Sequence, residues 1–261
     1  MRPFYFICLL ILSLVPVRPG YSQEQPAKTE KSTPIRIAVY VGSGTGRSKE
    51  DAIKALKQGA NIRVTRISAQ QIRSGQLMSF DVVVFPGGSG GRQGKSLGTE
   101  GRQQVRSFVK SGGGYVGICA GAYLATCDYS WSLGVLDAKV IDKKHWARGY
   151  GPVELGLSET GKKLFHNNSG KQTIYYHQGP LLAPAKNPNI PDYVHAAKFV
   201  GEIARNGAPR GVMPGTTAVA LGKFGKGRVV CFSPHPEKTE GLQHWLRDGV
   251  YWLRNGSPSV R

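Results

Sequence analysis

The sequence predicts an α/β fold, a doubly wound and mainly parallel sheet with helices on both faces and an antiparallel edge. Short β-branched runs alternate with stretches of helical apolar periodicity through the first half of the chain. Three of these runs end directly in a turn that contains glycine, as parallel strands do where they lead into a helix. With 261 residues and a hydrophobic content of 40%, the chain can bury the core of one sizeable domain.

The amino-terminal segment has the pattern of a secretory signal. Arg2 precedes an almost wholly apolar run over residues 4–17, and small residues lie three and one positions before a cut after Ser22. The run is too short for a comfortable membrane span, and no later stretch is apolar enough to cross a bilayer. We therefore expect residues 1–22 to be a signal peptide cleaved near Ser22 and the mature protein to be periplasmic or secreted, with an uncleaved anchor as the alternative.

The elements of the first half follow from local patterns. Residues 23–34 are polar and bounded by proline, so they predict a flexible linker, and the domain is expected over 35–256 with a tail at 257–261. Nearly continuous apolar runs indicate buried parallel strands, and an alternating run indicates a less buried one. In chain order we expect a strand at 35–41, a helix at 48–58 capped by Ser48, strands at 61–67 and 80–85, a helix at 99–110 capped by Thr99, and a strand at 115–118.

The second half has a looser pattern. Residues 133–213 are rich in glycine, proline and asparagine, which predicts antiparallel strands and long loops at an edge of the same sheet. The strands expected there lie at 138–141, 173–176 and 197–203. Two further runs, at 217–221 and 228–232, flank a Gly-Lys-Gly turn and predict a hairpin. A last helix is expected from Thr239, because one of its faces would carry Leu242, Trp245, Leu246, Val250 and Leu253.

The chain is strongly basic. Its formal charge is +19, and removal of residues 1–22 would take away Arg2 and Arg18 and no acid, which leaves +17. Such a charge favours anionic surfaces, among them the cell envelope. Nucleic acid is not an expected partner, because the basic residues are scattered without aromatic interleaving and because an exported protein seldom meets it.

Three of the four cysteines would remain after cleavage. An odd number in an exported protein leaves at least one free thiol, for which Cys119 is the candidate. Cys127 and Cys231 either pair with each other or are both buried as small hydrophobic residues. No spacing of cysteine and histidine suggests zinc, and neither a metal nor a cofactor is expected.

The strongest motif frames Cys119 as G-x-C-x-G (GICAG), directly after an apolar run. This pattern is typical of a nucleophile elbow, a tight strand-to-helix turn that presents one reactive side chain at the top of a sheet. Glycines are needed there because the backbones lie too close for a side chain. A buried structural thiol is the alternative, and the flanking glycines favour a nucleophile.

A second motif, SPHPE, also follows an apolar run and ends at Glu237. Sites in doubly wound sheets form at the carboxyl ends of strands, so we expect the fold to bring His235 and Cys119 together. His235 would take or hold the thiol proton, and Glu237 would orient the imidazole. The amides of Gly88 and Ala120 are the candidate donors to an oxyanion.

Other segments are expected near the same pocket. Residues 175–180 (YYHQGP) offer aromatic rings and a histidine, although a plain strand and turn is the alternative there. The candidate residues of a substrate pocket are Gly44, Thr45, Gly87, Tyr123 and His177.

Two glycine-rich segments look like nucleotide sites but depart from those motifs. Residues 89–96 (SGGRQGKS) end in G-K-S, yet Ser89 stands where the phosphate-binding motif needs glycine or alanine. Residues 42–46 lack the third glycine of G-x-G-x-x-G, because Arg47 takes its place. We expect the first segment to be a flexible basic loop bordering the site, and the second to approach the Cys119 pocket.

Together the motifs resemble the class I glutamine amidotransferase superfamily, and most closely the amidotransferase-like amino-terminal domain of some biotin–protein ligases. The segments that carry the resemblance are 35–45 (IRIAVYVGSGT), 84–88 (VFPGG), 112–124 (GGGYVGICAGAYL) and 232–237 (FSPHPE). The resemblance implies a flavodoxin-like fold. It also implies Cys119 as nucleophile with His235 and Glu237 as partners, and Gly88 and Ala120 as oxyanion donors.

Three hypotheses for the function follow. The preferred one is an exported hydrolase or amidase that acts on a small-molecule or peptide-like amide or ester through a Cys119 acyl-enzyme. The alternative is a non-catalytic binding module of the same fold that associates with anionic envelope material. The protease and chaperone branch of the superfamily ranks third, because its histidine usually follows the cysteine directly and Ala120 stands there.

Overall fold

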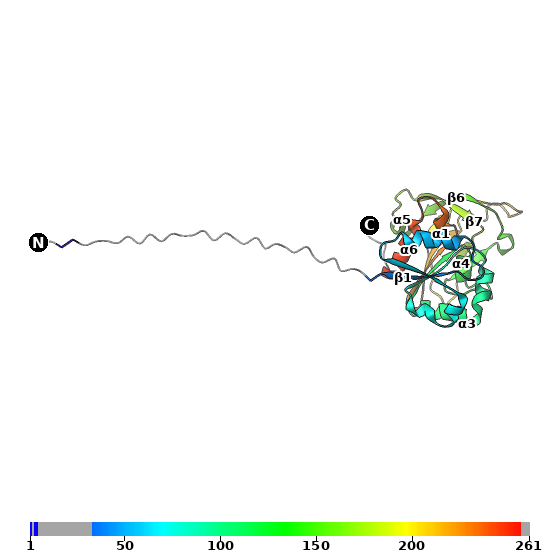
Figure 1. The fold of residues 1–261 in the computed structure, drawn as a ribbon. Helices are drawn as coiled ribbons and strands as arrows, with labels where there is room; N and C mark the ends of the chain where they lie inside the picture. Colours follow the sequence, from blue (N-terminus) through cyan, green and yellow to red (C-terminus); the bar gives the residue numbers. More distant parts are fainter. Residues whose placement is uncertain (2, 5–32, 257–261) are drawn as a thin grey trace. The chain divides into compact units, whose positions relative to one another are not determined.

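The computed structural model describes residues 1, 3, 4 and 33–256. Most of the predicted signal peptide, its cleavage near Ser22, nearly all of the predicted linker and the tail at 257–261 lie outside the described residues (Figure 1). Within the described residues, no helix is both long and apolar enough to cross a bilayer.

The strands of residues 33–256 form one 11-stranded sheet. Five of them run parallel, in the order β2, β1, β3, β4, β11. Their bounds are β1 (Ile35–Tyr40), β2 (Ile62–Ile67), β3 (Val82–Phe85), β4 (Gly114–Ile118) and β11 (Gly227–Phe232). Because these strands are parallel, the segments that follow β1, β3, β4 and β11 meet at one edge of the sheet.

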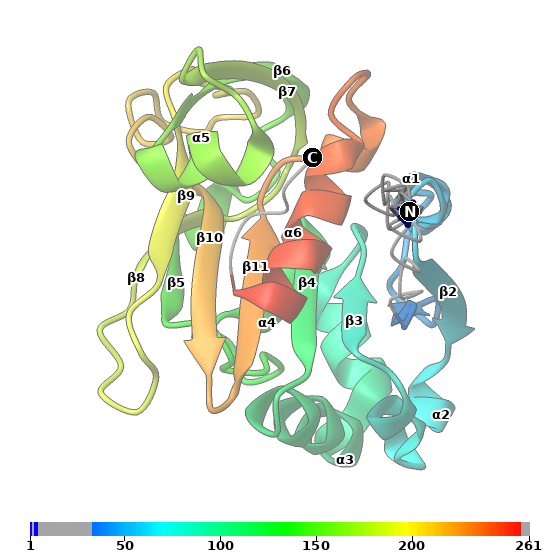
Figure 2. The ribbon, with the colours of Figure 1, turned by 90° about the vertical axis from the view of Figure 1, so that its left-hand side faces the viewer.

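The other strands continue the sheet in antiparallel fashion from β11 (Figure 2). The order is β10, β9, β6, β7, with β8 paired to both β10 and β5. Their bounds are β5 (Ala138–Ile141), β6 (Tyr150–Leu157), β7 (Lys171–His177), β8 (Leu181–Pro184), β9 (Val194–Phe199) and β10 (Thr217–Phe224). The predicted fold class is confirmed, and its antiparallel portion is wider than a single edge strand.

Helices cover both faces of the sheet, and each face has its own core. One core packs α1 (Ser48–Lys57), α5 (Glu159–Phe165) and α6 (His244–Asn255) against side chains such as Ile37 and Val39. The other packs α2 (Ala69–Arg73), α3 (Gly90–Lys110) and α4 (Ala120–Ala125) against the alternate side chains, such as Ala38 and Tyr40. This alternation is that of a strand buried on both faces. Figure 2 shows α6 crossing in front of the sheet. Residues 33–256 also contain the short 3-10 helices η1 (Gln76–Ser79), η2 (Lys143–His145) and η3 (Pro236–Lys238).

Several local predictions are wrong. Residues 89–96 are not a flexible loop: α3 begins at Gly90, the Ser89 side chain accepts a bond from the Arg92 amide, and the helix is interrupted only at Gly98. Ser48 does not cap α1, because the capping position belongs to Arg47. The strand expected at 197–203 lies at Val194–Phe199, and the last helix begins at His244 rather than at Thr239.

Candidate active site

Cys119 lies at the turn between β4 and α4 in a strained backbone conformation. Its φ of 49° and ψ of −98° lie outside the regions that non-glycine residues favour. The Cys119 amide donates to the Phe232 carbonyl of β11 at 2.8 Å, so the sheet pairing continues up to the turn. A Cβ on Gly117 would lie 2.5 Å from the carbonyl oxygen of Gly121, and a Cβ on Gly121 would lie 2.0 Å from that of Phe85. Close backbone approach therefore requires both glycines of the motif.

His235 and Glu237 form a buried pair beside this elbow. His235 Nδ1 lies 2.7 Å from Glu237 Oε1, and the two side chains are 4% and 0% exposed. The His235 amide donates to the Tyr175 carbonyl of β7 at 2.8 Å, which holds the loop after β11 in place. Because Glu237 occupies Nδ1, Nε2 is the ring nitrogen left for the Cys119 side chain.

The charges around His235 favour its protonated form. Burial alone would lower the pKa of His235, but the Glu237 carboxylate and the Cys119 side chain more than offset this effect and raise the pKa to about 10. A charged imidazole can give its proton to the leaving group of a reaction at the neighbouring Cys119. His235 thus holds a proton beside Cys119.

The Ser48 hydroxyl links the buried carboxylate to the loop after β3. It donates to Glu237 Oε1 at 2.7 Å and accepts from the Gly87 amide at 2.9 Å, and Ser48 is 3% exposed. A Cβ on Gly87 would lie only 2.7 Å from His235 Cε1, so this loop also packs against the imidazole. Sequence reasoning missed Ser48, because its partner lies 189 residues away along the chain.

The loops after β1 and β3 meet beside the elbow and carry one of the candidate oxyanion donors. Thr45 and Gly88 form an isolated antiparallel bridge, and the Ser89 amide donates to the Gly44 carbonyl at 2.7 Å. A Cβ on Gly88, whose φ is 144°, would lie 2.1 Å from that carbonyl oxygen, so only glycine fits. Among the hydrogen bonds of residues 33–256, neither the Gly88 amide nor the Ala120 amide donates to a protein acceptor. Both amides can therefore receive an oxyanion.

A cavity of about 900 Å³ opens over Cys119 and His235 at the carboxyl ends of the parallel strands. All five predicted pocket residues line it, and Gly88 does too, whereas Glu237 and Ala120 lie behind the surface. Residues of the three segments predicted to lie near the pocket (42–46, 89–96 and 175–180) also line it, and the lining residues outside these segments that the sequence did not indicate are Arg47, Ser48, Tyr129, Trp131, Lys143, Trp146 and Lys238. A cavity of this size accommodates a ligand considerably larger than a single amino acid.

The end of β7 forms one wall of the cavity. The Cys119 thiol donates to the His177 carbonyl at 3.4 Å, and the Tyr123 hydroxyl donates to the Gln178 carbonyl at 3.3 Å. The pKa of His177 is lowered by burial and by the positive charges of His235 and Lys238. The antiparallel half of the sheet thus supplies part of a site whose nucleophile comes from the parallel half.

Aromatic side chains line part of the cavity. The rings of Tyr129 and Trp131 stack at 4.5 Å with an interplanar angle of 14°, and Lys143 Nζ lies 4.9 Å from the centre of the Tyr129 ring. Trp131 packs on the first turns of α3, where a Cβ on Gly94 would lie 2.4 Å from the Trp131 carbonyl oxygen. A Cβ on Gly90 would lie 3.0 Å from the indole ring itself. The glycines of 89–96 therefore make room for the pocket wall.

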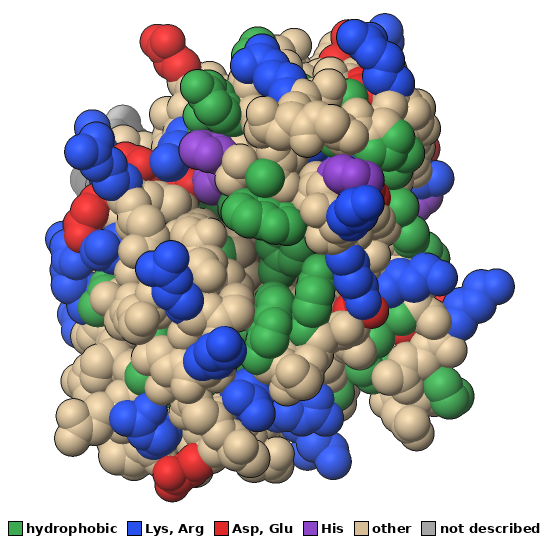
Figure 3. All heavy atoms as spheres, turned by 90° about the vertical axis from the view of Figure 1, so that its right-hand side faces the viewer, with side chains coloured by type: hydrophobic (Ala, Val, Ile, Leu, Met, Phe, Trp, Pro, Cys, Tyr) green, Lys and Arg blue, Asp and Glu red, His purple; other side chains and the backbone are tan. Residues whose placement is uncertain are grey.

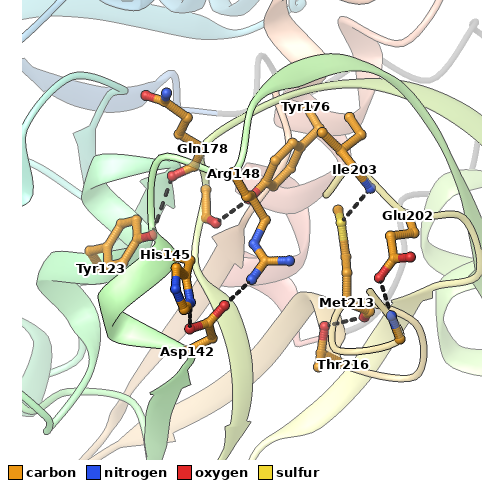
Figure 4. Close-up of polar contacts among 12 residues, drawn as sticks. Tyr123, Asp142, His145, Arg148, Tyr176, Gln178, Glu202, Ile203, Met213 and Thr216 are labelled. Atoms are coloured by element: carbon orange, nitrogen blue, oxygen red, sulfur yellow. Dashed lines mark hydrogen bonds and ion pairs between the residues drawn. The ribbon is translucent and has the colours of Figure 1, made fainter. Parts of the chain in front are cut away.

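A buried arginine anchors the η2 segment, which carries Lys143 and Trp146 to the cavity. Figure 4 shows Arg148 pointing to Asp142, with His145 on the same carboxylate. His145 Nδ1 lies 2.6 Å from Asp142 Oδ1, and Arg148 is 1% exposed. Arg148 Nη1 has no partner among the described residues. This buried pair holds the segment against the body of the domain.

The three cysteines of residues 33–256 are all free. Cys231 is fully buried in β11, and burial raises the pKa of its thiol well above the usual value. Cys127 is half-buried, its thiol donates to the Ala138 carbonyl at 3.4 Å, and burial raises its pKa too. The sequence left open whether Cys127 and Cys231 pair with each other, and the structure shows no disulfide between them.

Comparisons with known proteins support the resemblance seen in the sequence. Residues 35–152 match the family described as "Biotin-protein ligase, N terminal". The chain is similar in structure to PurLQS from Thermotoga maritima (TM-score 0.59, 17% identity, 85% of this chain and 100% of that chain covered). It is also similar to a protein described as a GMP synthase subunit, from Thermoplasma acidophilum (TM-score 0.57, 15% identity, 85% and 96% covered).

A third similar structure is a ThuA-like protein from Bacteroides uniformis (TM-score 0.56, 14% identity, 91% and 97% covered). No curated protein sequence matches the chain significantly. At these identities the likenesses show the fold, and the predicted resemblance to the class I glutamine amidotransferase-like superfamily is confirmed.

Proposed function

We propose that this class I glutamine amidotransferase-like domain is a cysteine-dependent hydrolase that cleaves an amide or ester bond through an acyl-enzyme on Cys119. The observation that carries the proposal is the strained elbow. It sets the Cys119 thiol beside the buried His235–Glu237 pair at the floor of a cavity of about 900 Å³. A nucleophile, a base and a group that orients the base are the parts that acyl transfer needs.

In the first half of the reaction, the Cys119 thiolate attacks the carbonyl carbon of the bound substrate. The negative charge that develops on the carbonyl oxygen is received by the Gly88 and Ala120 amides. His235 gives its proton to the departing amine or alcohol as the bond to carbon breaks, and Glu237 stabilises the charged imidazole until then. The products of this half are a thioester on Cys119 and the free leaving group.

In the second half, water attacks the thioester carbonyl. His235, now neutral, takes a proton from the attacking water, and the same two amides receive the oxyanion. Collapse of the second intermediate expels the Cys119 thiolate, releases the carboxylic acid and restores the protonated imidazole. Water is the acceptor in this proposal, so the released amine needs no further domain.

Export is part of the proposal, since the expected signal peptide would place this hydrolase outside the cytoplasm. Its expected substrates there are small or peptide-like amides and esters. The test is the amino-terminal mass of the protein recovered from the medium or the periplasm. A chain that begins at Gln23 supports the proposal, and a chain found only in the cytoplasm with Met1 intact contradicts it.

The experiment for the nucleophile compares the three thiols of the native protein. Cys119 is 6% exposed, less than the half-buried Cys127, so exposure alone would make Cys119 the slower of the two. We expect iodoacetamide at pH 7 to alkylate Cys119 at least about tenfold faster than Cys127, because Cys119 lies at the elbow beside His235, whereas burial raises the pKa of Cys127. Peptide mapping by mass spectrometry gives the separate rates.

Activity is tested by screening amide, peptide and ester substrates with the wild type and with Cys119→Ala. Hydrolysis that disappears in Cys119→Ala and persists in Cys127→Ala supports the proposal. A Cys119 thiol that reacts no faster than Cys127, or hydrolysis that survives in Cys119→Ala, contradicts it.

The second candidate function is non-catalytic association with anionic envelope material. It is favoured by the formal charge of +19, which scattered lysine and arginine side chains supply. It differs from hydrolysis in one decisive respect, because binding of this kind does not need the Cys119 thiol.

A further inference from the structure

We propose that the mouth of the Cys119 cavity is an anion subsite, and that the substrate carries a carboxylate or phosphate group beside the bond to be cleaved. This inference rests on the proposed hydrolase and names the class of its substrate. The carbonyl would lie at Cys119, and the anionic group would lie between the basic side chains at the rim.

Among the described residues, the cavity lining has basic side chains and no acidic ones. Arg47 precedes α1, Arg92 lies in the first turn of α3, Lys143 belongs to η2, and Lys238 ends η3. All four are exposed, and they come from four separate segments of the chain that the fold brings to one opening. Figure 3 shows one face of the molecule on which hydrophobic side chains line a hollow and blue basic side chains surround it.

Carboxylates that adjoin the lining residues in sequence are already paired. Asp128 Oδ1 accepts from Lys143 Nζ at 2.7 Å, so this lysine is largely neutralised. Asp142 is bound by Arg148, and Glu237 by His235. None of the three remains to offset the other cations at the mouth.

Three of the four cations lack such a partner. Among the described residues, the side chains of Arg47, Arg92 and Lys238 form no ion pair. The charge of Lys238 reaches the interior of the cavity, since it contributes to the lowered pKa of His177. Concave openings lined by one sign of charge concentrate ligands of the opposite sign.

An apolar surface adjoins these charges. Trp146 is 56% exposed and lies in the lining next to the segment that carries Lys143. The buried Arg148–Asp142 pair anchors this segment and so fixes the backbone that carries the Trp146 indole. The mouth therefore fits an amide with an anionic group on one side and an apolar portion on the other.

The first test compares two alkylating reagents that differ in charge. Iodoacetate carries a carboxylate, iodoacetamide is neutral, and both react with the thiolate of Cys119. Two variants lose the same charge: the mouth variant Arg47→Gln/Arg92→Gln/Lys238→Gln, and a control variant at the opposite end of the sheet, Arg63→Gln/Lys223→Gln/Lys226→Gln. The quantity measured is the ratio of the two alkylation rates at Cys119.

We expect the iodoacetate-to-iodoacetamide ratio to fall about tenfold in the mouth variant, to stay within about twofold in the control variant, and to fall in the wild type as salt is raised. His235 attracts iodoacetate in all three proteins, so its effect cancels in the comparison. A ratio that is unchanged in the mouth variant, or that falls equally in the control, overturns the subsite.

A second test needs no reactive thiol and so separates the two proposals. In a Cys119→Ala background, quenching of Trp146 fluorescence is measured with iodide and with neutral acrylamide, and Trp146→Phe identifies the signal. We expect the mouth variant to reduce iodide quenching about twofold and to leave acrylamide quenching unchanged. Equal quenching by iodide in both proteins overturns the subsite, whereas an inert Cys119 in the first test overturns only the hydrolase.

Discussion

The Ser48 hydroxyl holds the Glu237 carboxylate at the point where two loops meet. One oxygen, Glu237 Oε1, accepts both from Ser48 Oγ at 2.7 Å and from His235 at 2.7 Å. The second oxygen, Oε2, is buried without a partner among the described residues. Hydrogen bonds to a buried charge are worth about 1.5–3 kcal/mol each, so Ser48 has a large share in fixing this carboxylate.

Ser48→Ala is therefore expected to lower kcat about 10- to 100-fold and to change KM little, because the Ser48 hydroxyl is bound to Glu237 and the Gly87 amide and acts on the reaction through Glu237. The rate of Cys119 alkylation at pH 7 should fall with kcat, a change that a merely structural role would not produce. Ser48→Thr keeps the hydroxyl and should restore most of both rates. If Ser48→Ala is as fast as the wild type, or if Ser48→Thr is as slow as Ser48→Ala, Ser48 does not position the carboxylate.

The raised pKa of His235 makes stability depend on pH. Folded His235 keeps its proton up to about pH 10, whereas an unfolded histidine loses it near pH 6.5. The folded state thus binds more protons between these values, so this contribution is complete below about pH 6.5 and is lost as the pH rises through about 10. Glu237→Gln removes the main cause of the raised pKa and should cost about 2 kcal/mol at pH 6, and progressively less toward pH 10.

Urea unfolding of the wild type and of Glu237→Gln across this range measures the difference. The exposed neighbour Glu240 supplies the control, since Glu240→Gln removes the same charge and leaves the His235–Glu237 pair in place. A stability difference for Glu237→Gln that is constant or grows with pH would contradict the assignment of a protonated His235.

The residues of the candidate site that could be predicted are those whose signal is local. Cys119 lies between glycines that the turn needs, and His235 and Glu237 lie two residues apart after a strand. Ser48 and Trp131 could not be found this way, because their roles depend on contacts with distant segments. Serine at the start of a helix is typical of a cap, but the Ser48 hydroxyl bonds to Glu237 and to the Gly87 amide instead.

At the scale of elements, α3 shows how packing overrides helix propensity. Its first half, from Gly90 to Leu97, contains three glycines, a composition that predicts a loop. Glycine costs a helix about 1 kcal/mol relative to alanine, but here it lets Trp131 lie on the helix surface. The helix forms because the wall of the cavity packs on it, a contact with no signal in the local sequence.

Two substitutions in α3 should therefore act in opposite directions. A Cβ on Gly94 would lie 2.4 Å from the Trp131 carbonyl oxygen, so Gly94→Ala should destabilise the protein by about 1–3 kcal/mol. A Cβ on Gly91 would make only ordinary contact, 3.6 Å from the indole, so Gly91→Ala should be neutral or stabilise by up to about 1 kcal/mol. Urea denaturation of both variants checks this, and equal effects would show that Trp131 does not pack on α3 in this way.

For the whole molecule, the accuracy of prediction differs between the two halves of the sheet. The parallel strands are buried on both faces and carry continuous apolar runs, so the predicted bounds of β1, β3 and β4 agree with the structure within two residues. The prediction for β9 is wrong, because residues 194–199 alternate only weakly and gain their register from β6 and β10. The candidate site joins both halves, since β7 supplies His177 and the loop after β4 supplies Cys119.

The excess of basic residues belongs to the whole molecule, and it predicts a behaviour that the cavity does not control. With 35 lysines and arginines against 16 acids, the protein should bind vesicles that contain anionic phospholipid at low salt and dissociate by about 0.5 M salt, because the contacts are exposed and screened. Sedimentation with such vesicles measures the bound fraction. Cys119→Ala should bind equally well, and the mouth variant nearly as well, because it removes only three of many charges.

Binding that persists at 1 M salt would mean that apolar contacts hold the protein on the membrane. Loss of binding in the mouth variant alone would mean that the cavity mouth, and not the general surface charge, is the point of attachment.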